Sequence, residues 1–168
     1  TVNIPIIMKL GKNFTNPITL IDQLYANGAS AVVLFNRFYQ PDINIEKQVQ
    51  TVGPVFSHHS ELAESLRWIG IGSAKTPRID YAASGGVHNP EDVVKTILAG
   101  ASAVEICSTV YKNKNGIIKE MTDFMSQWMS KNGYDRISQY KGKLNAEDVK
   151  GINTFERTQF LKYYNHRN

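Results

Sequence analysis

The sequence contains little that would place it in a specialised class of protein. Its single cysteine, Cys107, excludes an internal disulfide and a cysteine-based zinc site. No apolar stretch approaches the ~20 residues that a membrane helix requires, and the first residues, Thr1-Val-Asn-Ile-Pro, lack the regions of a signal peptide. The net charge is only +4, and the basic residues form no dense run. We therefore expect a cytoplasmic protein that binds neither nucleic acid nor membrane.

Two further patterns are missing. No group of side chains has the spacing of metal ligands, so no metal site is predicted. No G-x-G-x-x-G follows the first predicted strand, which argues against a dinucleotide-binding unit. What the sequence does have is the composition of an ordinary globular domain, with 42% hydrophobic and 20% charged residues in 168.

Strand and helix patterns alternate along the chain. Apolar runs predict strands at residues 4–10, 31–35, 79–83 and 103–107, and the first is expected to be a buried parallel strand. Helical spacing with capping residues predicts helices at 16–28, 89–100 and 116–133. The last of these is expected to bury Ile117, Ile118, Met121, Phe124, Met125 and Trp128.

The remaining segments are less regular. Residues 40–44 resemble a loop, residues 43–56 suggest a small strand pair, and residues 60–69 suggest a helix. The chain beyond Gly142 is polar and then suggests a terminal helix at 155–164. We predict domain boundaries at 1–134 for the strand–helix repeats and 135–168 for a C-terminal extension that is mostly helical.

Two helix-to-strand junctions are nearly identical, Ala26-Asn-Gly-Ala-Ser-Ala-Val-Val and Leu98-Ala-Gly-Ala-Ser-Ala-Val-Glu. Such repetition is typical of βα units. Four units make half of a (β/α)8 barrel, and an open row of four buried strands would leave apolar edges uncovered. The predicted fold is therefore α/β, half of a TIM barrel that is completed elsewhere. A free-standing doubly wound domain of four strands is the alternative.

Small residues follow the third and fourth predicted strands. Ser84, Gly85 and Gly86 end one strand, and Cys107 and Ser108 end the next. The loops after the last two strands of a (β/α)8 barrel form its phosphate site, and glycine allows backbone N–H groups to approach an anion closely. These residues therefore predict a phosphate-binding site. The thiol of Cys107 is expected to be buried and inert.

Polar residues also end the first two strands. Lys9 in an otherwise apolar run is expected to place a cation at the mouth of the barrel. Asn36 can donate and accept hydrogen bonds toward a planar ring, whereas Arg37 either binds an anion or satisfies loop carbonyls. Glu105 is expected to face a polar neighbour, and surface roles are expected for His58 and His59. His88 is either a ligand contact or part of the helix entry.

With these residues laid out, the chain resembles the C-terminal half of a dihydroorotate dehydrogenase-like protein of the FMN-dependent barrel family. The resemblance covers almost the whole chain. The motifs that carry it are Ile6-Ile-Met-Lys-Leu, Leu34-Phe-Asn-Arg-Phe-Tyr-Gln-Pro-Asp, Leu66-Arg-Trp-Ile, Ala83-Ser-Gly-Gly-Val, Gly100-Ala-Ser-Ala-Val-Glu-Ile-Cys-Ser, Gly133-Tyr-Asp-Arg-Ile-Ser-Gln-Tyr-Lys-Gly and Phe155-Glu-Arg-Thr-Gln-Phe.

The resemblance implies an FMN cofactor and a reaction at a CH–CH bond of dihydroorotate or a related dihydropyrimidine. It implies that the FMN phosphate binds at residues 84–86 and 107–108, that Lys9 contacts the flavin and that Asn36 contacts the substrate. The family's catalytic base lies on a loop of the N-terminal half, so no catalytic residue is expected in this chain alone. The expected partners are the small-molecule substrate and the N-terminal half of the barrel, and a homodimer is left open.

Two features of the sequence depart from the family. The segment Arg37-Phe-Tyr-Gln-Pro-Asp stands where members that oxidise dihydroorotate carry a glycine-rich segment, which leaves the substrate open. No cysteine cluster for an iron–sulfur centre is present. Two other functions therefore remain as alternatives: a catalytically silent protein that binds flavin or phosphate, and a lyase or isomerase that handles a different phosphate compound.

Overall fold

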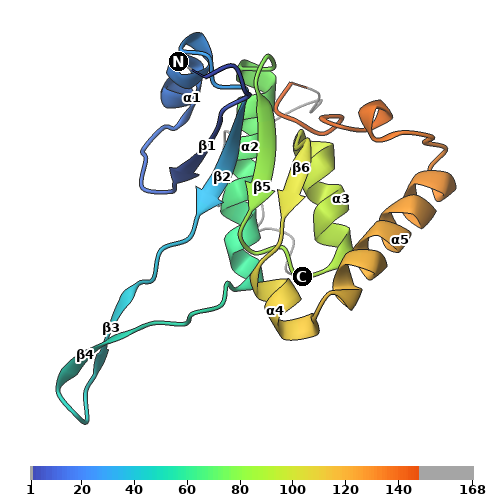
Figure 1. Cartoon of the computed structure of the whole chain (residues 1–168). Helices are drawn as coiled ribbons and strands as arrows, with labels where there is room; N and C mark the ends of the chain where they lie inside the picture. Colours follow the sequence, from blue (N-terminus) through green and yellow to red (C-terminus); the bar gives the residue numbers. More distant parts are fainter. Residues whose placement is uncertain (1, 148–168) are drawn as a thin grey trace, which may run out of the picture.

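A four-stranded parallel sheet forms the centre of the computed structural model, which describes residues 2–147 (Figure 1). The strand order is β1-β2-β5-β6, and each neighbouring pair is parallel. The strands are β1 (Ile7–Gly11), β2 (Ala31–Asn36), β5 (Asp80–Ser84) and β6 (Ala103–Glu105). The helices are α1 (Ile18–Ala26), α2 (Leu62–Lys75), α3 (Pro90–Ala99), α4 (Ser108–Asn113) and α5 (Gly116–Lys131).

Helices α1, α2 and α3 cover one face of this sheet. The register aligns Leu10, Leu34 and Ala83 on that face, and all three are buried. They share one hydrophobic core with Ile21 of α1 and Ile69 of α2. A doubly wound domain would carry helices on both faces. The one-sided cover is that of a partial (β/α)8 barrel, which confirms the predicted fold class.

The other face of the sheet is concave. Lys9 on β1 and Glu105 on β6 lie at opposite edges of the sheet, yet their Nζ and Oε2 atoms are 2.6 Å apart. Three strand spacings of about 4.8 Å separate these strands, so the two side chains must lean toward each other over the concave side. Ala82 and Ala103 share this face by register and leave room for both side chains.

The helix boundaries follow from local chemistry. The side chain of Asn16 accepts a hydrogen bond of 3.0 Å from the N–H of Ile18 and so begins α1. The carboxylate of Asp92 accepts one of 3.0 Å from the N–H of Asn89 at the start of α3. Gly28 and Gly100 follow the two helices with φ of 91° and 124°. The two near-identical junctions thus both end a helix with a glycine at positive φ and lead into the next strand, as expected of repeated βα units.

Three expectations about the first part of the chain and α5 are wrong. Strand β1 is parallel but not buried, because it is an edge strand; Ile7 and Met8 are 60% and 38% exposed. Pro41 starts a strand rather than a loop, since β3 (Pro41–Asn44) pairs antiparallel with β4 (Val49–Val52). Ile118 is exposed on α5 because it lies on the side of the helix away from α3 and α4.

The segment after α5 returns to the ends of helices α2 and α3. It contains one turn of 3-10 helix, Ile137–Gln139, and the buried ring of Tyr140, which packs against Trp128 and Tyr134. The N–H of Leu144 donates to the carbonyl of Leu98 at 2.9 Å. The terminal helix predicted at 155–164 lies outside the described residues, and the division at residue 134 stays a prediction. Within residues 2–147, no helix is both long and apolar enough to cross a membrane.

Candidate functional site

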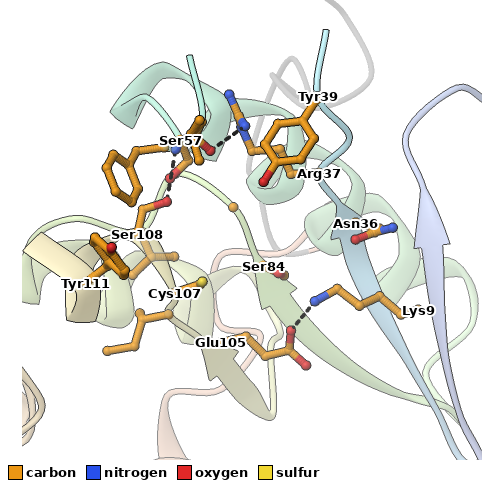
Figure 2. A pocket seen from close by; sticks show the side chains of 16 residues that line it. Lys9, Asn36, Arg37, Tyr39, Ser57, Ser84, Glu105, Cys107, Ser108 and Tyr111 are labelled. Carbon is orange, nitrogen blue, oxygen red and sulfur yellow. Dashed lines mark hydrogen bonds and ion pairs between the residues drawn. The ribbon is translucent and has the colours of Figure 1, made fainter. Parts of the chain in front are cut away.

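A cavity of about 740 Å³ opens at the carboxyl ends of the strands, over the concave face (Figure 2). It lies where the active sites of (β/α)8 barrels are found. All seven residues that the sequence singled out for binding line this one cavity. They are Lys9, Asn36, Ser84, Gly85, Gly86, Cys107 and Ser108.

The two glycines after β5 have different surroundings. Both have positive φ, 95° for Gly85 and 73° for Gly86. A Cβ on Gly86 would lie 2.2 Å from the backbone nitrogen of Leu62, the first residue of α2. A Cβ on Gly85 would have no atom within 4 Å. Gly86 is therefore required by packing against α2, whereas Gly85 leaves open space in which a ligand could approach the backbone.

The loop after β6 leads directly into α4. The hydroxyl of Ser108, the first residue of that helix, accepts a hydrogen bond of 2.9 Å from the N–H of Ser57. Cys107 is exposed, which corrects the expectation of a buried thiol. The reason is that β6 ends at Glu105, so Cys107 lies beyond the sheet. The sequence did not predict α4, because the run from Ser108 carries neither a capping pattern nor helical periodicity.

Lys9 and Glu105 form an ion pair inside the cavity. Figure 2 shows the two side chains reaching toward each other from β1 and β6. Both side chains are about half exposed, at 43% and 45%. The expectation that Glu105 faces a polar group is confirmed, and the group is the lysine of the predicted site. Asn36 is the last residue of β2 and is half-buried.

Arg37 is committed to its own loop rather than to an anion in the cavity. Its Nε lies 3.1 Å from both carboxylate oxygens of Glu61, and its terminal nitrogens donate to the carbonyls of Val55 and Pro54 at 2.8 and 2.7 Å. Burial raises the pKa of Glu61, but hydrogen bonds from the His58 N–H and from Arg37 outweigh it and lower that pKa. The hydrogen bonds of Arg37 thus hold the segment 54–61 in place beside the cavity.

A chain of hydrogen bonds connects this loop with the ends of β5 and β6. The hydroxyl of Ser57 lies 3.1 Å from Nε2 of His88, and Nδ1 of His88 lies 3.4 Å from the hydroxyl of Thr109. The hydroxyl of Thr109 also donates to the carbonyl of Val87, which joins the same network to the loop after β5. Burial, and then the charge of Lys112, lower the pKa of His88. His88 therefore has a helix-entry and loop-positioning role.

A second histidine contacts the start of α3. His59 Nε2 and Lys95 Nζ each lie 3.0 Å from Oδ1 of Asp92, which is fully buried. Oδ2 of Asp92 accepts the N–H groups of His88 and Asn89. Burial raises the pKa of Asp92, but these hydrogen bonds outweigh it and lower the pKa to about 2. His59 has a half-exposed side chain, in keeping with the surface role expected.

Sequence reasoning missed the apolar wall of the cavity. The rings of Phe56 and Tyr111 pack at a tilt of 40°, with 4.9 Å between their centroids, and Tyr39 and Ser57 also line the cavity. Tyr39, Phe56 and Ser57 come from the irregular segment between β2 and α2, and Tyr111 comes from the unpredicted α4. No periodic signal could have found them. Among the described residues, no group of three or more His, Cys, Asp or Glu side chains is arranged to hold a metal.

Fold and site together define part of a (β/α)8 barrel whose cavity, at the carboxyl ends of its strands, combines polar side chains with an apolar wall. No family model matches the sequence. The chain is 28% identical over 144 residues to the catalytic subunit of dihydroorotate dehydrogenase B (NAD(+)) from Thermoplasma volcanium, covering 84% of this chain and 47% of that protein. The same subunit from Methanosarcina mazei is 28% identical over 145 residues, covering 84% of this chain and 45% of that protein.

Solved structures agree on the fold. The crystal structure of DHODH in complex with ferulenol from Eimeria tenella has a TM-score of 0.68 and 19% identity, and the match covers 82% of this chain and 38% of that one. The chain is thus a relative of the dihydroorotate dehydrogenases, which confirms the resemblance predicted from its motifs. It spans about half the length of the curated relatives it matches.

Proposed function

We propose that this chain forms part of an FMN-dependent oxidoreductase of the dihydroorotate dehydrogenase type, acting on a CH–CH bond of a dihydropyrimidine. The observation that carries the proposal is that all seven residues predicted for binding line one cavity. The names of the relatives support the reaction class. A cytoplasmic location, expected from the sequence patterns, and a place in pyrimidine biosynthesis, implied by the resemblance, belong to the same proposal.

The cavity suits FMN in size and in chemistry. Its volume of about 740 Å³ is within the range of small-molecule sites. The open space beside Gly85 admits a phosphate to the backbone, and the N-terminus of α4 at Ser108 follows the second loop directly. Short helices of this kind contribute to the phosphate sites of barrels. Residues 84–86 and 107–108 would hold the phosphate.

FMN, when bound, supplies the acceptor for the hydride that leaves one carbon of the substrate, and a second substrate takes up the electrons afterwards. In this chain, Lys9 would place its ammonium beside the flavin, where it favours negative charge. Asn36 would donate and accept hydrogen bonds to the substrate ring. The proton of the adjacent carbon needs a base, which the resemblance assigns to the N-terminal half of the barrel.

The open edge of the sheet indicates where that half would bind. Strand β1 presents exposed Ile7 and Met8, and the preceding residues Ile4 and Ile6 are exposed as well. Such a row of apolar side chains on an edge strand favours pairing of its open edge with another strand. We therefore propose that the remaining βα units complete the barrel along β1 and β6. A homodimer stays a prediction.

Flavin binding and reduction test the proposal. The purified protein should quench FMN fluorescence, and the bound flavin should be reduced by dihydroorotate or a related dihydropyrimidine when the N-terminal half of the barrel, which carries the base, is present. Lys9→Ala should weaken FMN binding or slow flavin reduction at least tenfold, since hydrogen bonds to charged groups contribute roughly 1.5–3 kcal/mol. Lys119→Ala, which removes the same charge on exposed α5, should change neither quantity.

Other outcomes identify the alternatives. Flavin that binds to the complete barrel but is reduced by no dihydropyrimidine would indicate a silent flavin-binding protein. Absence of flavin binding together with binding of a sugar phosphate would indicate a lyase or isomerase. Unchanged FMN affinity and unchanged reduction in Lys9→Ala would remove the role given to that lysine.

A further inference from the structure

We propose that Glu105 is a positioning residue for Lys9: it holds the Lys9 ammonium over the cavity and offsets the charge that Lys9 presents to an anionic ligand. The flavin part of this inference rests on the proposed function; the positioning part does not. This role of Glu105 is separate from phosphate binding by the two loops and from the flavin contact of Lys9.

The geometry of the ion pair carries the inference. Lys9 and Glu105 come from opposite edges of the sheet, 96 residues apart in the chain, and meet at 2.6 Å over the concave face. An unrestrained lysine on an edge strand would turn into solvent, where its ammonium is best hydrated. Here the carboxylate directs the ammonium across the cavity instead. Figure 2 shows the ion pair between Lys9 on β1 and Glu105 on β6.

The charge balance of the cavity makes the contact important. Among the described residues that line it, the charged ones are Lys9, Arg37 and Glu105. Arg37 is occupied by Glu61 and two loop carbonyls. The cation that faces the cavity is therefore Lys9, and its partner offsets much of its charge.

Glu105 also lies close to the loops proposed for phosphate. It pairs in register with Ser84, and Cys107 follows two residues later. Without its lysine partner, this carboxylate would repel a bound anion, because the two negative charges would lie close together in a partly enclosed site. Loss of Lys9 would therefore have two effects, because it removes a cation and also exposes the negative charge of Glu105.

This double effect predicts an asymmetric set of variants. Glu105→Gln should bind FMN more tightly than the wild type by about threefold, since exposed ion pairs contribute a few-fold to an equilibrium constant. Lys9→Ala should bind FMN more weakly. The double variant Lys9→Ala with Glu105→Gln should recover at least about threefold of the affinity that Lys9→Ala loses. Asp123→Asn, which removes a carboxylate of an exposed ion pair on α5, is the matched control.

The first experiment needs no cofactor. The purified protein is treated briefly with acetic anhydride, and acetylation of Lys9 is measured by peptide mass spectrometry in the wild type, Glu105→Gln and Asp123→Asn. Glu105→Gln should raise the acetylation rate of Lys9 at least about threefold, because its Nζ is no longer held in the ion pair. Asp123→Asn should leave Lys9 unchanged. Circular dichroism melting checks that each variant is folded.

The second experiment measures FMN affinity by fluorescence quenching and the flavin midpoint potential in the same variants. Glu105→Gln should raise the potential; a threefold preference for the reduced flavin corresponds to about 14 mV for a two-electron couple. Unchanged Lys9 acetylation in Glu105→Gln would overturn the inference, whether or not FMN binds. Increased acetylation with no FMN binding by any variant would support the positioning role and remove the proposed function instead. FMN binding without rescue in the double variant would overturn the charge-balancing role.

Discussion

Gly85 and Gly86 are adjacent residues with similar φ values but different neighbours. Both substitutions to alanine place a side chain at positive φ, which costs about 1–2 kcal/mol. Gly86→Ala adds a collision with the backbone of Leu62, and overpacking adds about 1–3 kcal/mol or more. We expect Gly86→Ala to lower the free energy of unfolding at least twice as much as Gly85→Ala, measured by urea denaturation.

The same pair separates folding from binding. Gly85→Ala should keep most of the stability but reduce FMN binding, because its Cβ would enter the open space beside the loop. Equal losses of stability in the two variants would contradict the packing role of Gly86. Normal FMN binding in Gly85→Ala would contradict the close approach of phosphate to that glycine.

Asp92 gives the molecule a pH-dependent stability. Its pKa is lowered to about 2 in the folded protein, from 3.8, so it stabilises the fold above pH 4 and loses this effect as the pH falls toward 2. The lowered pKa of Asp92 contributes about 2 kcal/mol to the free energy of unfolding above pH 4. We expect Asp92→Asn to be less stable at pH 7 and to lose less stability between pH 4 and pH 2. Glu120→Gln, exposed on α5, is the control.

Urea denaturation at a series of pH values checks this prediction. The wild type and Glu120→Gln should show the same dependence on pH. If the free energy of unfolding falls equally in the wild type and in Asp92→Asn between pH 4 and pH 2, the hydrogen bonds to Asp92 do not lower its pKa.

Single residues of the site were predictable where a strand end fixes their position. Lys9, Asn36 and Ser84 lie at or near the carboxyl ends of strands, so an accurate strand prediction brings them together at one edge of the sheet. The exposure of Cys107 was not predictable in this way, because it depends on where β6 ends. Contacts such as Ser57 with Ser108, 51 residues apart, depend on a loop path that no local pattern specifies.

At the level of elements, helix α2 contains a glycine that faces the sheet. A Cβ on Gly72 would lie 2.7 Å from the ring of Tyr81, which is buried. Alanine favours a helix over glycine by about 1 kcal/mol, but forcing a buried ring aside costs about 1–3 kcal/mol. We expect Gly72→Ala to destabilise the protein by about 1 kcal/mol.

A matched substitution tests whether packing, rather than helix propensity, decides this result. Gly116 begins α5 and has no atom within 4 Å of its Cβ position. Gly116→Ala should therefore be neutral or slightly stabilising in thermal denaturation. A higher melting temperature for Gly72→Ala would show that the helix can shift away from Tyr81 at little cost.

The elements that the sequence predicted well are those with strong local signals. Helices α1, α3 and α5 have a cap or a terminal glycine together with apolar periodicity. Helix α4 has six residues and takes its place from the loop before it, and the β3–β4 hairpin has no buried face that would produce a hydrophobic pattern. Helix α4 depends on tertiary position, so single-sequence patterns could not establish it. For the hairpin, the sequence suggested a strand pair at 43–56 but missed that its first strand begins at Pro41.

At the scale of the whole molecule, the sheet is curved but open. Its helix-covered face is packed, whereas β1 at one edge has exposed apolar side chains and, within residues 2–147, no strand beyond it. The sequence predicted the open row of four strands from the count of βα units. It could not predict the burial of β1, because the burial of an edge strand depends on the strand that would pair with it.

This edge leads to a prediction about association. The chain of 168 residues, studied by itself, should self-associate with increasing concentration, because exposed Ile6, Ile7 and Met8 form an unpaired strand edge. Replacing Ile7 by lysine should reduce that association severalfold in sedimentation velocity, since a charged edge strand resists pairing. Ile118→Lys, which changes an isolated exposed side chain on α5, should leave the association as it is. A chain that stays monomeric at 100 µM, or two lysine variants with equal effects, would show that β1 is not the surface through which the barrel is completed.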